Sequence, residues 1–195
     1  PNAGTGKSTV ALVLIVCLTK VVAKVGVFRP FVDSRDEDPF LNLLLARSGS
    51  ATPAAQCIGV TWDEYHAAPE ESLSRIVDAY RAMARDHDVV IIDGSDFTDV
   101  AGTPELDLNA RVAANIGVPV LLVVSGRGAP EDVRASVEVS VAEIAENHAR
   151  TVAVIANRCP AATRGAVAAA LSGIEGLTVT TLPEVPLLSA PSVRE

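Results

Sequence analysis

The chain has 195 residues, of which 49% are apolar and only 4% aromatic, and its formal net charge at pH 7 is −8. This length and composition fit one α/β domain whose core is built from Val, Ala, Leu and Ile. The acidic balance argues against a nucleic-acid-binding surface and fits a cytoplasmic protein. The longest apolar run, residues 10–18, is too short to cross a membrane.

The first half of the chain alternates helical patterns with short apolar strands. In chain order, the predicted elements are a helix over 7–23, a strand over 24–30, a helix over 38–47, a strand over 55–61, a helix over 68–87 and a strand over 88–93. Pro30 is expected to end the first of these strands. Asp38 followed by Pro39 has the pattern of a helix N-cap.

The second half continues the same alternation. The predicted elements are a helix over 103–117, a strand over 118–125, a helix over 129–149, a strand over 151–158, a helix over 163–173 and a strand over 177–183. Short, fully apolar strands separated by helices predict a three-layer α/β fold, with a mostly parallel sheet covered by helices on both faces. Because no internal repeat or long linker is visible, residues 1–195 are interpreted as one domain.

A glycine-rich turn stands at the start of the first helix, in "PNAGTGKSTVALVL". Such a turn binds phosphate because backbone N–H groups converge on the anion and the helix dipole favours negative charge. Lys7 is expected to reach the β- and γ-phosphates, and the Ser8 hydroxyl to bind Mg²⁺. The full GxxxxGK[ST] pattern has a leading glycine where Pro1 stands. The predicted nucleotide-binding residues of the turn are Ala3, Gly4, Thr5, Gly6, Lys7, Ser8 and Thr9.

An acid follows the apolar run 89–92. Asp93 is expected at the carboxyl end of a buried strand, where it would hold Mg²⁺ or one of its water ligands. The alternative is a strand that simply ends in Asp before a turn. No nucleophile pattern or histidine pair is visible, so no catalytic residue is predicted, and the three scattered cysteines are interpreted as buried reduced thiols.

Six segments occur in an order that resembles a known family: "GTGKSTVALVL", "VAKVGVFRPF", "DVVIIDGSDFTDV", "ELDLNARVAANIGVPVLLVV", "VIANRC" and "LPEVPLLSAPSV". They resemble the N-terminal P-loop domain of long phosphate acetyltransferases of the actinobacterial type. That domain is similar to dethiobiotin synthetase and cobyrinic acid diamide synthases. The resemblance implies ATP or another nucleoside triphosphate and Mg²⁺ as ligands.

The resemblance also implies roles for individual residues. Arg29 stands where the synthetase-like pattern has a lysine that binds substrate or γ-phosphate, and it keeps the charge but not the compact ammonium. Asp38 matches a possible metal ligand, with the helix cap as its competing role. Asp93 matches the acid of an "EGAGG" segment whose following glycines are replaced here, which weakens a ligase interpretation.

Two further positions concern the nucleotide base. Asn157, in "IANR", matches an asparagine that reads adenine through its amide. Pro183 and Glu184, in "LPEVP", match a loop that wraps the base.

In the resembled enzymes, acetyl transfer between coenzyme A and phosphate belongs to a separate C-terminal domain. The sequence therefore predicts a nucleotide- or metabolite-binding regulatory and assembly domain with that acetyltransferase domain as its partner. Two alternatives remain open: a stand-alone ATP-dependent ligase of the dethiobiotin synthetase type, and a structural module with a decayed site.

Relatives place a strand of about six apolar residues before the glycine turn, and they continue into further domains after the segment that matches "SAPSV". The chain is therefore interpreted as truncated at both ends relative to the family. Without that central strand, two neighbouring strands would expose their edges, which favours a homo-oligomer.

Overall fold

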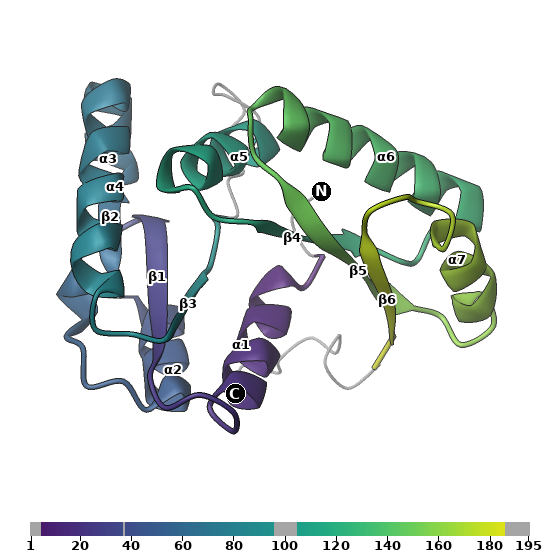
Figure 1. Ribbon diagram of the computed structural model, residues 1–195, viewed down its shortest axis with the longest axis horizontal. Helices are drawn as coiled ribbons and strands as arrows, with labels where there is room; N and C mark the ends of the chain where they lie inside the picture. The colour runs from purple at the N-terminus through teal and green to yellow at the C-terminus, as the bar shows by residue number, and fades with distance from the viewer. Residues whose placement is uncertain (1–4, 37, 96–104, 186–195) are drawn as a thin grey trace, which may run out of the picture.

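The computed structural model describes residues 5–36, 38–95 and 105–185. The described strands form two parallel sheets of three strands each, in the orders β2–β1–β3 and β4–β5–β6 (Figure 1). The strands are β1 (Val25–Val32), β2 (Ile58–Thr61), β3 (Val89–Ile92), β4 (Val120–Ser125), β5 (Thr151–Cys159) and β6 (Thr178–Pro183). The helices are α1 (Lys7–Leu18), α2 (Pro39–Ser48), α3 (Trp62–Ala67), α4 (Pro69–Ala84), α5 (Glu105–Ile116), α6 (Pro130–Glu146) and α7 (Arg164–Leu171), and a 3₁₀ turn covers Ala54–Gln56.

The predicted α/β fold with a parallel sheet and helices on both sides is confirmed. Helices α4, α5 and α6 contact one another in that order, whereas α1 contacts α2. Figure 1 shows α5 and α1 on opposite sides of the strands. One short helix, α3, was not predicted. It begins at Trp62, and its N-cap Thr61 forms a capping box with Glu64.

Pro30 does not end the first strand, as the sequence had suggested, because β1 continues to Val32. Successive residues of a strand direct their N–H groups to opposite neighbours. The Arg29 N–H donates to Cys57 O of the β2 side at 2.8 Å. The position of the missing Pro30 N–H therefore faces the β3 side, where the pairing register already ends at Phe28 and Ile92. The last hydrogen bond on that side runs from the Asp93 N–H to Phe28 O, and β1 continues to Val32 through its pairing with β2, which does not need the Pro30 N–H.

The core consists of two clusters of buried apolar side chains, one on each sheet. Phe28, Leu44 and Ile76 belong to the first cluster, and Val137 and Val154 belong to the second. Helix α5 contributes to both, because its Leu108 and Val112 pack in the first cluster and its Ala110 and Ala113 in the second. The two sheets are thus joined through α5.

Between β3 and β4 lies a cavity of about 610 Å³ whose lining is largely apolar. Sequence analysis had interpreted the run 88–93 as a fully buried strand. Instead, all four residues of β3 are only partly buried, whereas seven of the eight residues of β1 are buried. β3 lines the cavity, which accounts for its exposure.

The cysteines correct a second expectation. Cys57 and Cys159 are buried, but Cys17 is exposed on α1. Burial raises the pKa of the Cys57 thiol to about 11 and also raises the pKa of Cys159. These two thiols are therefore poor nucleophiles at neutral pH, because the reactive form is the thiolate.

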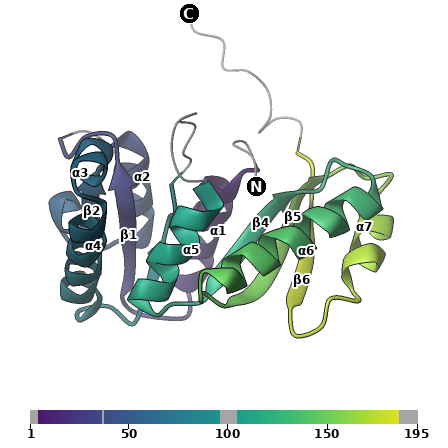
Figure 2. The ribbon, with the colours of Figure 1, turned by 90° about the horizontal axis from the view of Figure 1, so that it is seen from above.

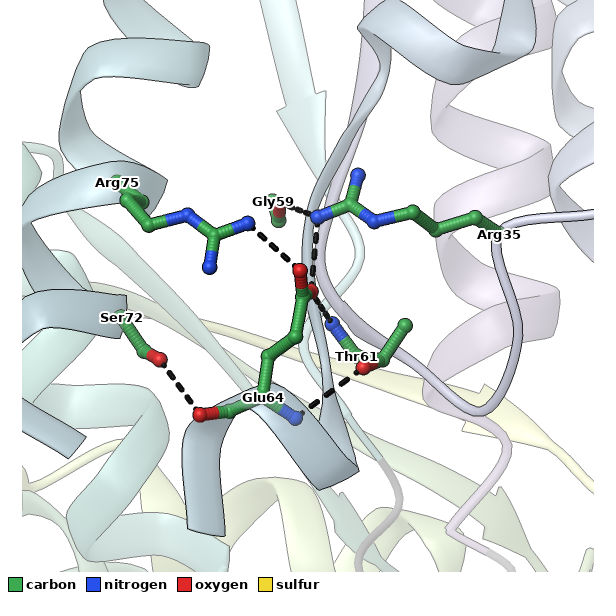
Figure 3. A network of polar contacts seen from close by, with 6 residues as sticks. All are labelled: Arg35, Gly59, Thr61, Glu64, Ser72 and Arg75. Atoms are coloured by element: carbon green, nitrogen blue, oxygen red, sulfur yellow. Dashed lines mark hydrogen bonds and ion pairs between the residues drawn. The ribbon is translucent and has the colours of Figure 1, made fainter. Parts of the chain in front are cut away.

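Glu64 joins several elements of the first sheet (Figure 3). Its carboxylate accepts hydrogen bonds from Arg75 Nη2 at 2.7 Å, Arg35 Nη2 at 2.8 Å and the Thr61 N–H at 2.7 Å. Arg35 also donates to Gly59 O at 2.9 Å. The hydrogen bond from Arg75, followed by that from Thr61, lowers the pKa of Glu64 from 4.5 to about 2.

Glu64→Gln is expected to lower the free energy of unfolding at pH 7 by about 1 kcal/mol, since the ion pairs are partly exposed. A depressed pKa in the folded state stabilises the fold above the unfolded value. The difference from wild type should therefore be full above pH 4.5 and shrink as the pH falls towards 2. Urea titrations between pH 2 and pH 7 measure it, with Glu146→Gln on α6 as the control. A difference that stays constant over this range would contradict the prediction.

Candidate functional site

The glycine turn leads directly into α1. Gly6 is the N-cap residue, with φ 83° and ψ 24°, and no side chain caps the helix there. This left-handed conformation suits glycine. An uncapped helix N-terminus presents backbone N–H groups and the positive end of the helix dipole, which together attract an anion. Lys7, Ser8 and Thr9 form the first turn of the helix, with Lys7 and Ser8 half-buried and Thr9 exposed.

Asn157, at the carboxyl end of β5, contacts the glycine turn. Its Nδ2 donates a hydrogen bond to Thr5 O at 2.8 Å. A Cβ atom added to Gly6 would lie 2.5 Å from the same nitrogen. The close approach and the positive φ therefore both require glycine at position 6.

Asp93 comes from the other sheet, directly after β3. Its backbone N–H donates to Phe28 O at 3.0 Å, and only 2% of the residue is exposed. Asp93, Lys7 and Thr5 line the same cavity. Thr5 is also held by Asn157 near the end of β5, so residues from the carboxyl ends of both sheets line this cavity or contact its lining. Figure 2 shows β1 pointing towards the side of the molecule where α1 begins.

Arg29 lies between two acids. Its Nε is 3.4 Å from Asp93 Oδ2, and its Nη1 donates to Asp38 Oδ2. The guanidinium carbon also lies 5.8 Å from the centre of the Phe40 ring. A planar guanidinium can serve two carboxylates at once, which an ammonium would do less well.

Asp38 performs the cap role that competed with metal binding in the sequence. Its Oδ1 accepts from the Leu41 N–H at 2.9 Å, and its Oδ2 accepts from Arg29. Both carboxylate oxygens are thus engaged within the protein. In the described part of the chain, no group of three or more His, Cys, Asp or Glu side chains is arranged to hold a metal.

The end of β6 lies beside the loop that follows β4. Arg127 Nε donates to the Glu184 carboxylate at 2.9 Å, and the Glu184 N–H donates to Cys159 O at 2.9 Å. Pro183 is exposed and pairs in register with Cys159. Ala3 and Gly4, the two remaining predicted residues, lie outside the described part of the chain.

Three residues of this region were not predicted from the sequence: the arginines Arg127 and Arg158, and Ser95. Arg158 follows Asn157 with φ 59°, a conformation that non-glycine residues seldom adopt. The Nε atom of Arg158 would lie 3.7 Å from a Cβ atom added at Gly6, so this side chain lies beside the glycine turn. The signal available in the sequence was a basic residue directly after Asn157 at a strand end. Arg127 and the buried Ser95, whose backbone is held by Asn109, had no comparable signal.

These features define the chain as a P-loop-type α/β domain, with a glycine-capped helix where parallel strands end. Residues 1–192 match the AAA domain family, and because the match spans nearly the whole chain, the protein belongs to that family.

Two curated relatives are phosphate acetyltransferases, which confirms the resemblance seen in the sequence. The protein of Nitratidesulfovibrio vulgaris is 28% identical over 173 residues, covering 79% of this chain and 23% of the relative. The protein of Synechocystis sp. PCC 6803 is 24% identical over 206 residues, covering 100% of this chain and 30% of the relative. The chain thus spans less than a third of the length of either.

Among solved structures, the arginine decarboxylase of Paramecium bursaria Chlorella virus aligns over 90% of this chain and 62% of its own. The sequence identity is 11% and the TM-score 0.36, so this alignment carries no inference. No helix in the described ranges is long and apolar enough to span a membrane.

Proposed function

We propose that this domain binds ATP or another nucleoside triphosphate with Mg²⁺, and that binding regulates a phosphate acetyltransferase to which the domain contributes. One observation carries the nucleotide half: Thr5, Lys7 and Asp93 line one cavity, and Lys7 stands on the first turn of a helix whose N-terminus is uncapped. The relatives supply the link to the acetyltransferase.

Different residues of the chain would bind the phosphates and the base of the nucleotide. Backbone N–H groups of the first turn of α1 would hold the phosphates, and the Lys7 ammonium would neutralise their charge. Asn157 would fix the turn through Thr5 and stand near the base. Arg158, next to Gly6, adds a second positive charge to this end of the site.

Mg²⁺ fits this donor set. It prefers oxygen ligands, keeps several waters, and is usually held by one or two carboxylates together with substrate phosphates. Asp93 and the Ser8 hydroxyl would be its protein donors, and the ion would compete with Arg29 for Asp93, whereas both oxygens of Asp38 are engaged, one by the α2 cap and one by Arg29. When bound, the ion would neutralise phosphate charge.

Regulation requires that the nucleotide bind one state of the enzyme more tightly than another. The corresponding change would be in the activity or oligomeric state of the acetyltransferase part. The ligase alternative is disfavoured because Arg29 replaces its lysine and is held between Asp38 and Asp93.

Isothermal titration of the 195-residue chain with ATP, ADP and GTP, each with and without Mg²⁺, tests the nucleotide half. Saturable binding that Mg²⁺ strengthens is expected for at least one triphosphate. Absence of binding for all three nucleotides would overturn the proposal. Assay of a phosphate acetyltransferase containing this domain, with and without the bound nucleotide, tests the regulatory half.

A further inference from the structure

Arg29 connects the carboxylate expected to bind the cation with the N-terminus of α2. Its Nε lies 3.4 Å from Asp93 Oδ2, and its Nη1 donates to Asp38 Oδ2. We propose that Arg29 holds Asp93 in place of a cation until Mg²⁺ arrives with a nucleotide, and that its guanidinium then turns into a second cavity. This inference rests on the proposed function and names the residue that makes cation binding depend on the nucleotide.

Asp93 needs a positive partner whenever no cation is bound. Only 1% of its side chain is exposed, and a buried carboxylate is stable only when it is paired. Arg29 supplies the charge, because a guanidinium stays protonated in proteins. Two cations repel each other strongly where water is excluded, so they cannot both lie against one buried carboxylate. Binding of Mg²⁺ at Asp93 therefore requires that Arg29 move away.

The backbone around Asp93 is fixed on two sides. The Asp93 N–H donates to Phe28 O of β1 at 3.0 Å. Two residues further on, the Ser95 N–H donates to Asn109 Oδ1 of α5 at 3.1 Å, and Asn109 Nδ2 donates back to Ser95 O at 3.3 Å. The guanidinium of Arg29, in contrast, ends a side chain with several rotatable bonds. Arg29 is therefore the partner that moves when the ion pair breaks.

The two contacts of Arg29 differ in strength. Arg29 Nη1 makes a direct hydrogen bond to Asp38, whereas the 3.4 Å between Arg29 Nε and Asp93 exceeds the roughly 2.7–2.9 Å of a charge-assisted hydrogen bond. Asp38 is itself held in place as the N-cap of α2, where its Oδ1 accepts from the Leu41 N–H at 2.9 Å. The contact with Asp93 should therefore break first, while Arg29 stays bonded to Asp38.

A second cavity, of about 260 Å³, can receive the displaced guanidinium. Its lining includes Arg29 itself and four residues that could meet the guanidinium there: Asp33, Asp38, Trp62 and Ser95. Among the residues that the structure describes, the buried Ser95 Oγ has no hydrogen-bond partner, so it can accept a hydrogen bond from Arg29. The state of the cation site would thus be transmitted to a cavity beside the N-terminus of α2.

Titration of the 195-residue chain with Mg²⁺ alone, followed through its unfolding temperature, tests the competition without any nucleotide. Arg29→Met should raise the affinity for Mg²⁺ at least about tenfold, because the competing charge is gone. Asp38→Asn keeps a good N-cap but leaves Arg29 with Asp93 as its acidic partner, so the affinity should fall at least roughly threefold. Arg47→Met, in the last turn of α2, removes the same charge and should leave the affinity unchanged.

Two further measurements distinguish this role of Arg29 from direct metal binding by Asp38. In the Arg29→Met background, Asp38→Asn should not change the Mg²⁺ affinity further, whereas a loss that persists would show that Asp38 itself binds the ion. Trp62 is the only tryptophan of the chain and lines the second cavity. Its fluorescence should therefore change when Mg²⁺–ATP saturates the wild type, and it should not change in Arg29→Met.

Circular dichroism checks that each variant folds. Equal Mg²⁺ affinity of Arg29→Met and wild type would overturn the proposal, as would a persistent loss in the double variant. If Arg29→Met does not fold, Asp38→Asn and the Trp62 signal decide: an unchanged or higher Mg²⁺ affinity, or constant fluorescence on saturation, would overturn it. If no nucleotide binds although Arg29→Met gains Mg²⁺ affinity, the nucleotide proposal fails while the competition between Arg29 and the cation stands.

Discussion

Lys7→Ala is expected to weaken binding of Mg²⁺–ATP by about 100-fold, because a charge-assisted contact to phosphate contributes roughly 2–3 kcal/mol. Lys7 stands on the first turn of α1 and lines the cavity together with Thr5 and Asp93. The ammonium is the group that would oppose the triphosphate charge, so its loss should act mainly on affinity. Titration calorimetry under fixed ionic strength measures the change.

Lys20→Ala is the matched control, since Lys20 is an exposed lysine just beyond the other end of the same helix. It should leave the affinity unchanged. The same two substitutions in a phosphate acetyltransferase containing this domain separate a regulatory site from a decayed one. If Lys7→Ala alters neither nucleotide affinity nor enzyme regulation, the domain is a structural module.

Gly126→Ala is expected to lower the free energy of unfolding by about 3 kcal/mol, the upper range for overpacking a core. The added Cβ would lie 2.2 Å from Cys159 Sγ and 3.2 Å from Asn157 O. Gly126 N–H also donates to Asn157 O at 2.6 Å, so the substitution would push on the strand end that holds the glycine turn. Chemical denaturation measures the stability, and the same titration as above measures the loss of nucleotide binding.

A double-mutant cycle identifies the clash. In a Cys159→Ala background the sulfur is gone, and the added cost of Gly126→Ala should fall to about 1 kcal/mol. Gly165→Ala, on α7 with no atom within 4 Å of the added Cβ, should be neutral or slightly stabilising. Equal costs of Gly126→Ala in both backgrounds would show that the sulfur is not the obstacle.

Local patterns in the sequence were sufficient for most of the architecture. Apolar runs, the Asp38–Pro39 cap and the glycine turn depend on neighbouring residues alone, and the corresponding strands and helices are present. Both roles of Asp38 were visible, but the cap could be separated from metal binding only by seeing its two oxygens engaged. Pro30 was misjudged because its tolerance depends on where the pairing with β3 ends.

The motif at residues 4–9, the acid at Asp93 and the strand-end Asn157 are local features, and the amino-acid order alone was enough to propose a phosphate site from them. How these residues are brought together in space could not be predicted from the sequence. The contact of Asn157 with Thr5 spans 152 residues, and Arg29 meets Asp93 only because β1 and β3 pair in parallel. Contacts of this range depend on strand order and helix packing, which periodicity does not encode, and the same is true of the cavity between β3 and β4.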